Sequence, residues 1–341
     1  IDALRRRARF DRSLVALAQS VEVRARELPD DEIGDDQLRL IFACCHPARA
    51  VEAQIALALR EVCGLRTEEI ARALLGSPSA IAQRIVRAKA RLREVGASGE
   101  APGPAELPLR LAGVQQVIYL VFNEGYTATR GDDWMRPAMC DEALRLARVL
   151  LALMPDEPEV LGLLALLEIQ ASRSAARTDA EGRPVLLERQ DRSRWDHLLI
   201  RRGLEAIARA ESLARTPGPY QLQAAIAACH ARAASADATD WGRMAALYDD
   251  LARVQPSPVV ELNRAVAVSR HAGAAAGLQV LQPLLAEPAL ARYPWLAAVQ
   301  GDLLEQLGRR DEARAAFERA AALTHNAQDR ALMQARAASL N

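Results

Sequence analysis

The spacing of apolar residues predicts helices along nearly the whole chain. Apolar positions recur every three or four residues rather than at alternate positions, which is the pattern of one buried helix face. Alanine, leucine, arginine and glutamate, all good helix formers, dominate the composition. We therefore predict an all-α protein. Glycine, proline and acidic stretches divide it into ranges 1–35, 36–95, 96–108 and 109–341.

The range 36–95 predicts four short helices. The first ends before Pro47, and the second is followed by Gly64, a residue suited to a helix C-terminus. Their expected buried faces consist of Leu38, Ile41, Phe42 and Cys45 in the first helix and of Val51, Ile55, Leu59 and Val62 in the second.

The third and fourth helices have the pattern of a helix-turn-helix. Thr67 is the expected N-cap of the third helix. Gly76 begins the turn, Ser77 is placed to cap the fourth helix, and Pro78 takes its first position. The narrow apolar stripe expected on the fourth helix consists of Ile81, Ile85, Ala88 and Leu92.

A second face of the fourth helix carries the candidate DNA-binding chemistry. Five basic residues and no acidic residue occur from Arg84 to Arg93. Amide and guanidinium groups suit base edges, cations suit phosphates, and small residues let the helix N-terminus enter the major groove. A solvated basic face without a ligand is the competing interpretation. The candidate DNA-binding residues are Ser79, Ala80, Gln83, Arg84, Arg87, Lys89 and Arg91.

The range 109–341 predicts a series of helical pairs after a flexible hinge. The hinge, 96–108, is rich in glycine and proline. The last pair has the spacing of a tetratricopeptide repeat, in which small residues let two helices approach and an aromatic ring fills the gap. The residues with this spacing are Gly301, Leu304, Gly308, Ala313, Phe317 and Ala320.

Composition and motifs exclude several classes of protein. The net charge is zero, although a local basic face can still bind nucleic acid. We find no phosphate-binding Walker loop, no GxSxG and no metal-ligand spacing, so we expect no catalytic residue, cofactor or metal and no enzyme. Five cysteines without a disulfide framework, and no membrane-length apolar run, favour a cytoplasmic protein without a membrane partner.

Several conspicuous residues are predicted to be structural. Adjacent Cys44 and Cys45 diverge on a helix, so a buried pair is favoured over a metal site. The segment 123–126 is interpreted as a helix end with Gly125 at the C-cap rather than as a catalytic loop. Wedges between helices are expected at Trp195, His197 and Trp241, and His230 has no visible partner.

The chain resembles one family of transcription proteins. Thr67–Ala71 and the later pattern of Ala80–Leu92 resemble region 4.2 of extracytoplasmic-function sigma factors. The segment 36–47 is similar to the start of region 4 in a subgroup with a C-terminal tetratricopeptide-like extension. The extension is matched by Phe122–Tyr126, Asp191–Asp196, Gly218–Ile226 and Ser257–Ala267.

The resemblance implies a sigma region 4 that recognises the promoter −35 element and docks on the RNA polymerase β-flap. It implies a regulatory extension that docks on the sigma domains, on polymerase or on another protein. Ile1–Arg6 resembles the end of region 2.4, so most of region 2 is expected to lie outside this chain. The alternatives are a helix-turn-helix activator with a ligand- or protein-sensing repeat domain, and a scaffold whose basic helix is incidental.

Overall fold

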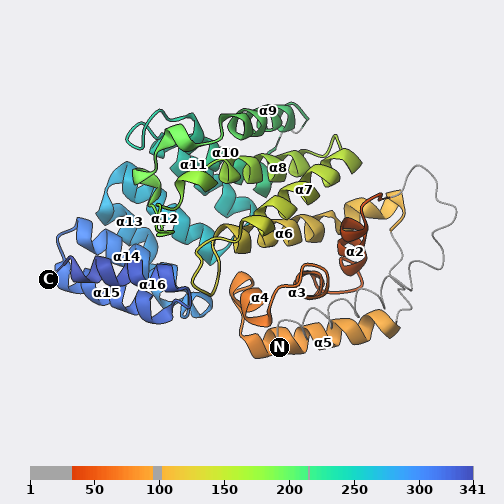
Figure 1. Ribbon diagram of the computed structural model, residues 1–341, viewed down its shortest axis with the longest axis horizontal. Coiled ribbons are helices and arrows are strands. Elements are labelled where there is room, and N and C mark those ends of the chain that lie inside the picture. Colours follow the sequence, from red (N-terminus) through yellow and green to blue (C-terminus); the bar gives the residue numbers. More distant parts are fainter. Residues whose placement is uncertain (1–32, 95–101, 214–215, 341) are drawn as a thin grey trace. The chain divides into compact units, whose positions relative to one another are not determined.

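Helices form the regular structure of the protein. The computed structural model describes residues 33–94, 102–213 and 216–340. Within these ranges it contains fifteen α-helices, several short 3-10 turns and no β-strand (Figure 1). The predicted all-α fold is confirmed. The expectation for Ile1–Arg6, and most of the predicted linker 1–35, fall outside the described residues.

The chain divides into two compact units. The first, the helix-turn-helix unit, extends to Glu124 and includes Arg145–Leu153. The second, the extension unit, comprises Gly125–Leu144 and Met154–Asn341. The division therefore falls within helices α6 (Leu107–Tyr126) and α7 (Pro137–Leu153). The functional ranges 36–95, 96–108 and 109–341 stay a prediction.

The helix-turn-helix unit begins with the four helices that the sequence predicts. They are α2 (Asp36–Cys44), α3 (Val51–Glu61), α4 (Thr67–Ala73) and α5 (Pro78–Glu94). Helix α3 packs against the other three, and α4 packs against α5. The fully buried residues of this core include Leu38, Ile41, Phe42, Ile55, Leu59 and Ile70. Val51 does not join them, because this first residue of α3 is 48% exposed.

The N-cap predicted for α4 is wrong by one residue. Arg66 occupies the N-cap position, and Thr67 is the first helical residue. The Glu69 carboxylate accepts a hydrogen bond from the Arg66 backbone N–H at 2.7 Å. An acid at the third helical position can thus satisfy the cap backbone, so the hydroxyl at Thr67 is not needed there.

The first half of α6 completes the core of the helix-turn-helix unit. A Cβ atom at Gly113 would lie 3.0 Å from Gln54 Oε1 and 3.1 Å from Cys45 Sγ. Three residues earlier, Arg110 Nη1 donates to the Phe42 carbonyl at 3.2 Å. Cys45 is fully buried in this contact. Residues beyond position 108 therefore stabilise the same core as α2 and α3.

Cys44 and Cys45 form the buried pair that the sequence predicts. Burial raises the pKa of the Cys44 thiol to about 12, so the thiol stays protonated at neutral pH. Over the ranges that the structure describes, no three His, Cys, Asp or Glu side chains are grouped as metal ligands would be.

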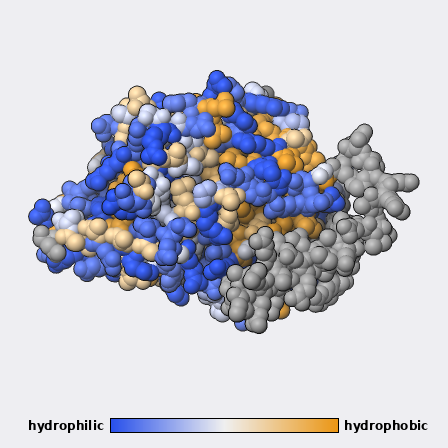
Figure 2. All heavy atoms as spheres, viewed as in Figure 1, coloured by the Kyte–Doolittle hydropathy of each residue, from blue (hydrophilic) through white to orange (hydrophobic). Residues whose placement is uncertain are grey.

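The extension unit is an array of successive helices. Helix α8 packs against both α9 and α10, and from α10 onward each helix packs against the next, through to α16. Hydrophilic residues predominate over α11 to α16 on the face shown in Figure 2. The helices are α8 (Pro158–Ala171), α9 (His197–Leu213), α10 (Pro219–Arg232), α11 (Trp241–Val254), α12 (Pro258–Ala272), α13 (Ala274–Leu281), α14 (Pro294–Gln306), α15 (Arg310–Leu323) and α16 (Ala327–Ala338).

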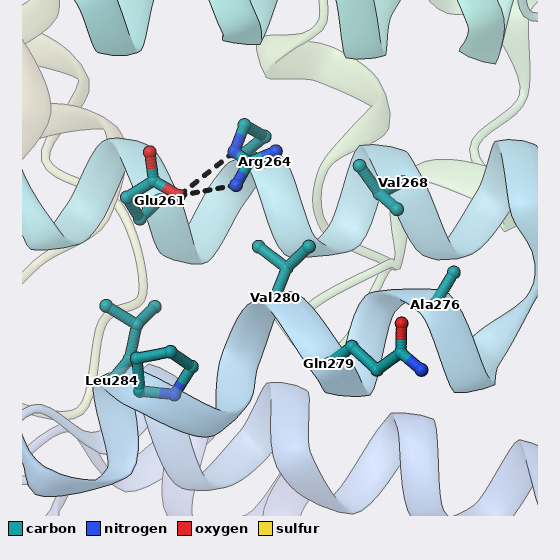
Figure 3. A pocket seen from close by; sticks show the side chains of 8 residues that line it. Glu261, Arg264, Val268, Ala276, Gln279, Val280 and Leu284 are labelled. Atoms are coloured by element: carbon teal, nitrogen blue, oxygen red, sulfur yellow. Dashed lines mark hydrogen bonds and ion pairs between the residues drawn. The ribbon is translucent and has the colours of Figure 1, made fainter.

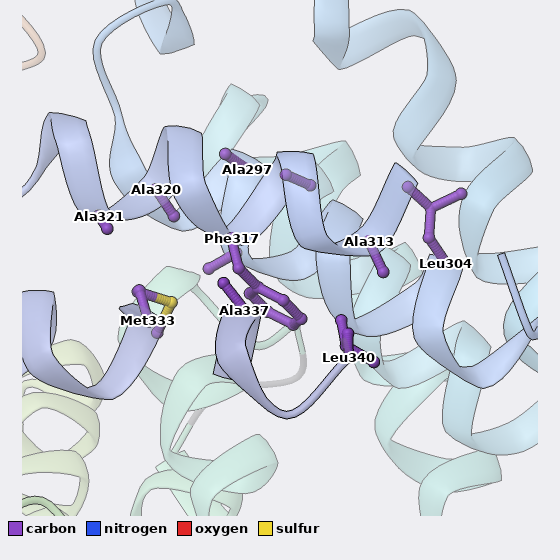
Figure 4. Packing of buried hydrophobic residues seen from close by; sticks show 11 residues of the cluster. Ala297, Leu304, Ala313, Phe317, Ala320, Ala321, Met333, Ala337 and Leu340 are labelled. Carbon is purple, nitrogen blue, oxygen red and sulfur yellow. The ribbon is translucent and has the colours of Figure 1, made fainter. Parts of the chain in front are cut away.

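The last helices have the packing expected of a tetratricopeptide-like pair. A Cβ atom at Gly301 on α14 would lie 2.9 Å from ring atoms of Phe317 on α15. Glycine therefore lets the aromatic ring lie directly against the α14 backbone. Phe317 is surrounded by small residues of α14, α15 and α16 (Figure 4). The predicted tetratricopeptide-like array is confirmed as the fold of the extension.

Gly125 has a different role from the predicted one. Helix α6 continues through it to Tyr126, so Gly125 is not a C-cap residue. A Cβ atom there would lie 2.7 Å from the Cys140 backbone nitrogen and 2.8 Å from Met139 Cβ. The glycine is required because α7 crosses α6 at this point with its backbone in contact.

Two of the three residues predicted to be wedges between helices do pack against other helices. Trp195 is buried, and Trp241 packs half-buried against the core of α10, α11 and α12. His197 is exposed at the start of α9, so its predicted wedge role is wrong. His230 has the partner that the sequence did not reveal, because its ring meets the edge of Trp241 at a centroid distance of 5.3 Å.

Candidate nucleic-acid interface

The turn between α4 and α5 is built as the sequence predicts. Ser77 Oγ accepts a hydrogen bond from the Ala80 N–H at 3.2 Å, and Pro78 is the first residue of α5. Leu75 lies in the left-handed region with φ of 50°, a conformation that lets the chain reverse between the helices. The cap and the turn fix the direction in which α5 leaves α4.

An apolar stripe fixes the rotation of α5 about its own axis. Ile81, Ile85 and Ala88 are buried, and α5 packs against α3 and α4. The predicted stripe is confirmed for these three residues, while the side chain of Leu92 falls outside the described part of the helix. The remaining faces of α5 are left for solvent or a partner.

The predicted DNA-binding residues lie on the outer side of α5. Arg84 and Lys89 are half-buried. The other five are exposed, namely Ser79, Ala80, Gln83, Arg87 and Arg91. Ser79 Oγ lies 3.1 Å from Ser77 Oγ, and Arg87 Nε donates a long hydrogen bond of 3.4 Å to the Gln83 carbonyl. The structure therefore brings these seven residues onto one accessible helix.

Lys89 has an acidic partner inside the helix-turn-helix unit. Its Nζ lies 2.8 Å from Glu61 Oε2 at the end of α3. The Lys89 side chain is 41% exposed and the Glu61 side chain is 15% exposed. The acid that neutralises Lys89 is 28 residues away in sequence, so helix periodicity did not reveal it.

Val86 is a candidate contact residue that the sequence pattern missed. It is 66% exposed, lies outside the buried stripe and directly precedes Arg87. A large apolar side chain held in water on a polar face is a useful signal, and the methyl group of thymine is an apolar feature of the major groove. Only the exposure, and not the helix pattern, distinguishes Val86 from a core residue.

The extension unit has a shallow groove between α12 and the α13 region (Figure 3). Its floor is apolar, and Glu261 and Arg264 stand on one side. Arg264 is already paired with Glu261 at 2.9 Å and with Asp249 at 3.2 Å. The groove therefore offers little charge to a ligand.

No helix in the described ranges is long and apolar enough to cross a membrane.

Comparisons with known proteins agree with the two-part organisation. Residues 51–92 match the family model described as "Sigma-70, region 4", and residues 110–211 match one described as "Family of unknown function (DUF6596)". The "uncharacterized protein R00370" of Rhizobium meliloti (strain 1021) is 50% identical over 322 residues, which cover 93% of this chain and 75% of that protein.

One solved structure is also similar. It is a tetratricopeptide repeat protein from Parabacteroides merdae with 12% identity and a TM-score of 0.41, covering 84% of this chain and 91% of that chain.

The region 4 match covers α3 and the helix-turn-helix built by α4 and α5. A sigma region 4 is a module that binds DNA and interacts with RNA polymerase. The match is followed directly by the helical array, as in the subgroup that the sequence resembles. The chain belongs to the sigma-70 family, as a sigma factor of the extracytoplasmic-function type with a tetratricopeptide-like helical extension.

Proposed function

We propose that this protein directs RNA polymerase to promoters as an alternative sigma factor, and that its range 36–95 recognises the −35 element. The observation that carries the proposal is the outer face of α5, where amide and guanidinium donors are exposed beside a fixed apolar stripe. A recognition helix needs this arrangement, because its inner face must hold it rigid while its outer face reads the groove.

The residues of α5 divide into two expected roles. Gln83, Arg84 and Arg87 lie within about one turn of each other and can reach base edges, while Val86 can contact a thymine methyl group. Arg91 and Lys89 lie farther along the helix and are assigned to phosphates. Ser79 and Ala80 have small side chains, which allow the helix N-terminus to approach the bases.

The same region is proposed to dock on the polymerase β-flap, as the resemblance to region 4 implies. The extension is proposed to regulate this activity by docking on the sigma domains or on polymerase. Helix α6 supports a coupled role, since its first half belongs to the core of the helix-turn-helix unit and its last two residues belong to the extension unit.

A salt titration of DNA binding tests the proposed interface. The full chain is titrated onto −35-like duplexes, and Gln83→Ala, Arg84→Ala and Arg87→Ala are compared with the parent. Loss of a base contact is expected to cost about 1–3 kcal/mol of discrimination between duplexes. Arg91→Ala is expected to weaken binding to all duplexes alike and to lower the salt slope by about one.

The control is Arg201→Ala, which removes an exposed arginine of α9 that pairs only loosely with Glu205, at 3.9 Å. It is expected to leave binding unchanged. If Arg84→Ala and Arg87→Ala bind with the affinity and salt slope of the parent, α5 is not the recognition helix. Binding of the purified β-flap to the full chain, measured by anisotropy, tests the polymerase contact separately.

A further inference from the structure

A cationic and aromatic cluster lies in the extension unit, away from α5 in sequence. We call it the arginine–tryptophan cluster, and it consists of Arg173, Arg192, Trp195 and His230. Arg173 follows α8, while Arg192 and Trp195 belong to the short turn before α9. The guanidinium carbons of Arg192 and Arg173 lie 4.5 Å and 6.0 Å from the centroid of the Trp195 ring. Both arginines therefore lie close to one indole.

Two donors in this cluster have no acceptor. Trp195 is only 4% exposed, and its Nε1 makes no hydrogen bond. Arg192 Nη1 donates to the carbonyls of His230 and Ala233, at 2.6 Å and 2.9 Å, but its Nη2 is buried without a partner. Leaving a buried donor unsatisfied costs free energy, and the cost is larger for a charged group. Two such donors on adjacent groups are a sign that an acceptor belongs there.

The charges of the cluster are also uncompensated. In the described part of the chain, neither Arg173 nor Arg192 forms an ion pair, because the acids near them in sequence, Glu168 and Glu188, pair with Arg202 and Arg270 instead. Burial, followed by the positive charges of Arg173 and Arg192, lowers the pKa of His230 to about 4. The site thus has two permanent cations and a neutral imidazole that an anion would make easier to protonate.

We propose that the arginine–tryptophan cluster is an anion-binding site of the extension and that its ligand is the phosphoryl dianion of a small molecule. A dianion balances the two arginines, whereas a carboxylate would balance one. Its three terminal oxygens can accept from Arg173, Arg192 Nη2 and Trp195 Nε1, and guanidinium groups match phosphate geometry well. Arg173 and His230 are only partly buried and form the side from which a ligand enters.

The entry requires a small rearrangement. The unpaired atoms of Arg192 and Trp195 are closed to solvent, and the Arg173 side chain is tied to the Gln170 side-chain oxygen. Exchange of this neutral acceptor for a phosphate oxygen is favourable, because a charge-assisted hydrogen bond is stronger than one to an amide. The site goes beyond promoter recognition and would let the extension sense a metabolite.

Nitrogen-15 NMR of the tryptophan indoles in the full chain tests the site. The four tryptophans give four indole N–H signals, which single Trp→Phe changes assign. Inorganic phosphate is expected to shift the Trp195 signal saturably, while the signal of Trp295, which packs partly buried against the core of α14 to α16, stays in place. Sodium chloride at the same ionic strength is the reference. A Trp195 signal that does not move, or that moves equally in chloride, overturns the proposal.

Variants separate a binding role from a structural one. Arg192→Gln is expected to weaken phosphate binding by about tenfold or more, whereas the exposed Arg201→Gln binds as the parent does. Should Arg192→Gln not fold, as judged by the other three indole signals, Arg173→Gln replaces it with the same expectation. Unchanged phosphate affinity in a folded variant refutes the site. Glycerol phosphate binding more tightly than inorganic phosphate identifies a monoester as the source, and the reverse order identifies free phosphate.

Discussion

Helix α5 and the C-terminal helices of the extension use the same residue type for opposite purposes. On α15 and α16 the arginines are bound to their own protein, since Arg336 contacts Asp302 at 2.9 Å and also Glu305, and Arg314 pairs with Asp311. On α5, Arg84 and Arg87 form no ion pair with any residue that the structure describes. Arginines that lack internal acids remain available for an external anion such as DNA.

The difference also explains why composition conceals the function. Forty-four basic and forty-four acidic residues cancel over the whole chain. In the extension, acids lie one turn or one helix from the bases that they pair with, whereas Arg84 and Arg87 on α5 have no acid paired with them among the described residues. A local excess of charge, and not the net charge, determines what a surface binds.

The largest expected effect on stability comes from a change in the core of α14 to α16, the region whose arginines are paired internally. Phe317→Ala removes a fully buried ring lying against Gly301 and leaves a cavity, so α14 to α16 should lose about 3–5 kcal/mol of stability. Hydrogen exchange of the α15 amides measures this loss locally. DNA binding is expected to stay unchanged. A matching loss of DNA affinity would show that DNA binding by α5 depends on the C-terminal helices of the extension.

The second effect is a dependence of extension stability on pH. Burial, followed by the charges of Arg173 and Arg192, lowers the pKa of His230 to about 4, below its usual value of 6.5. The unfolded chain therefore binds a proton more readily, and this stability is complete above pH 6.5 and is lost as the pH falls toward 4. The loss is on the order of 3 kcal/mol at most.

Thermal unfolding of the full chain between pH 4 and pH 7 checks this expectation. His230→Phe keeps an aromatic ring against Trp241 and should remove much of the acid-induced loss. His197→Phe is the control, because His197 is exposed and its replacement should leave the pH profile as it is. Equal profiles for the parent and His230→Phe would show that other groups cause the acid sensitivity.

In both regions, some features could be predicted from the sequence alone. Periodicity and caps are local, so Ser77, Pro78 and the stripe from Ile81 to Ala88 could be predicted from neighbours in the chain. Gly301 and Phe317 were predictable because the repeat has a known spacing. In both cases the physical cause lies within two adjacent helices.

The remaining features depend on contacts that no local pattern encodes. Gly125 was mistaken for a helix end because the crossing of α7 at Cys140 is a tertiary contact. The partners of His230 and Lys89, which are Trp241 and Glu61, come close only when the chain folds. The arginine–tryptophan cluster joins residues 173, 192, 195 and 230 in the same way. Exposure of Val86 likewise required the packed helix.

A third prediction concerns the contribution of α6 to the helix-turn-helix unit. Gly113→Val adds a Cβ atom, to which Gln54 and Cys45 already lie close, and two methyl groups beyond it, so the unit should lose about 1–3 kcal/mol of stability. Gly103→Val is the control, since no atom lies within 4 Å of a Cβ there. Urea unfolding followed through the α3 amides measures the difference. Equal stability of the two variants would mean that the core does not include α6.

The smallest expected effect separates Lys89 from the arginines beside it. The Lys89–Glu61 pair is partly exposed, so Lys89→Met should cost less than about 1 kcal/mol of stability. Because Glu61 holds the ammonium group, Lys89→Met should lower the salt slope of DNA binding by less than Arg91→Ala does. Glu61→Gln removes the competing acid and frees the ammonium group, so it should strengthen DNA binding and steepen the slope. In the double variant that combines Lys89→Met with Glu61→Gln, this gain in DNA affinity should disappear, since no ammonium group remains to be freed. If Glu61→Gln instead leaves the affinity and the salt slope unchanged, Lys89 does not contact DNA. Its charge then serves only the protein itself, as the paired charges of the extension do.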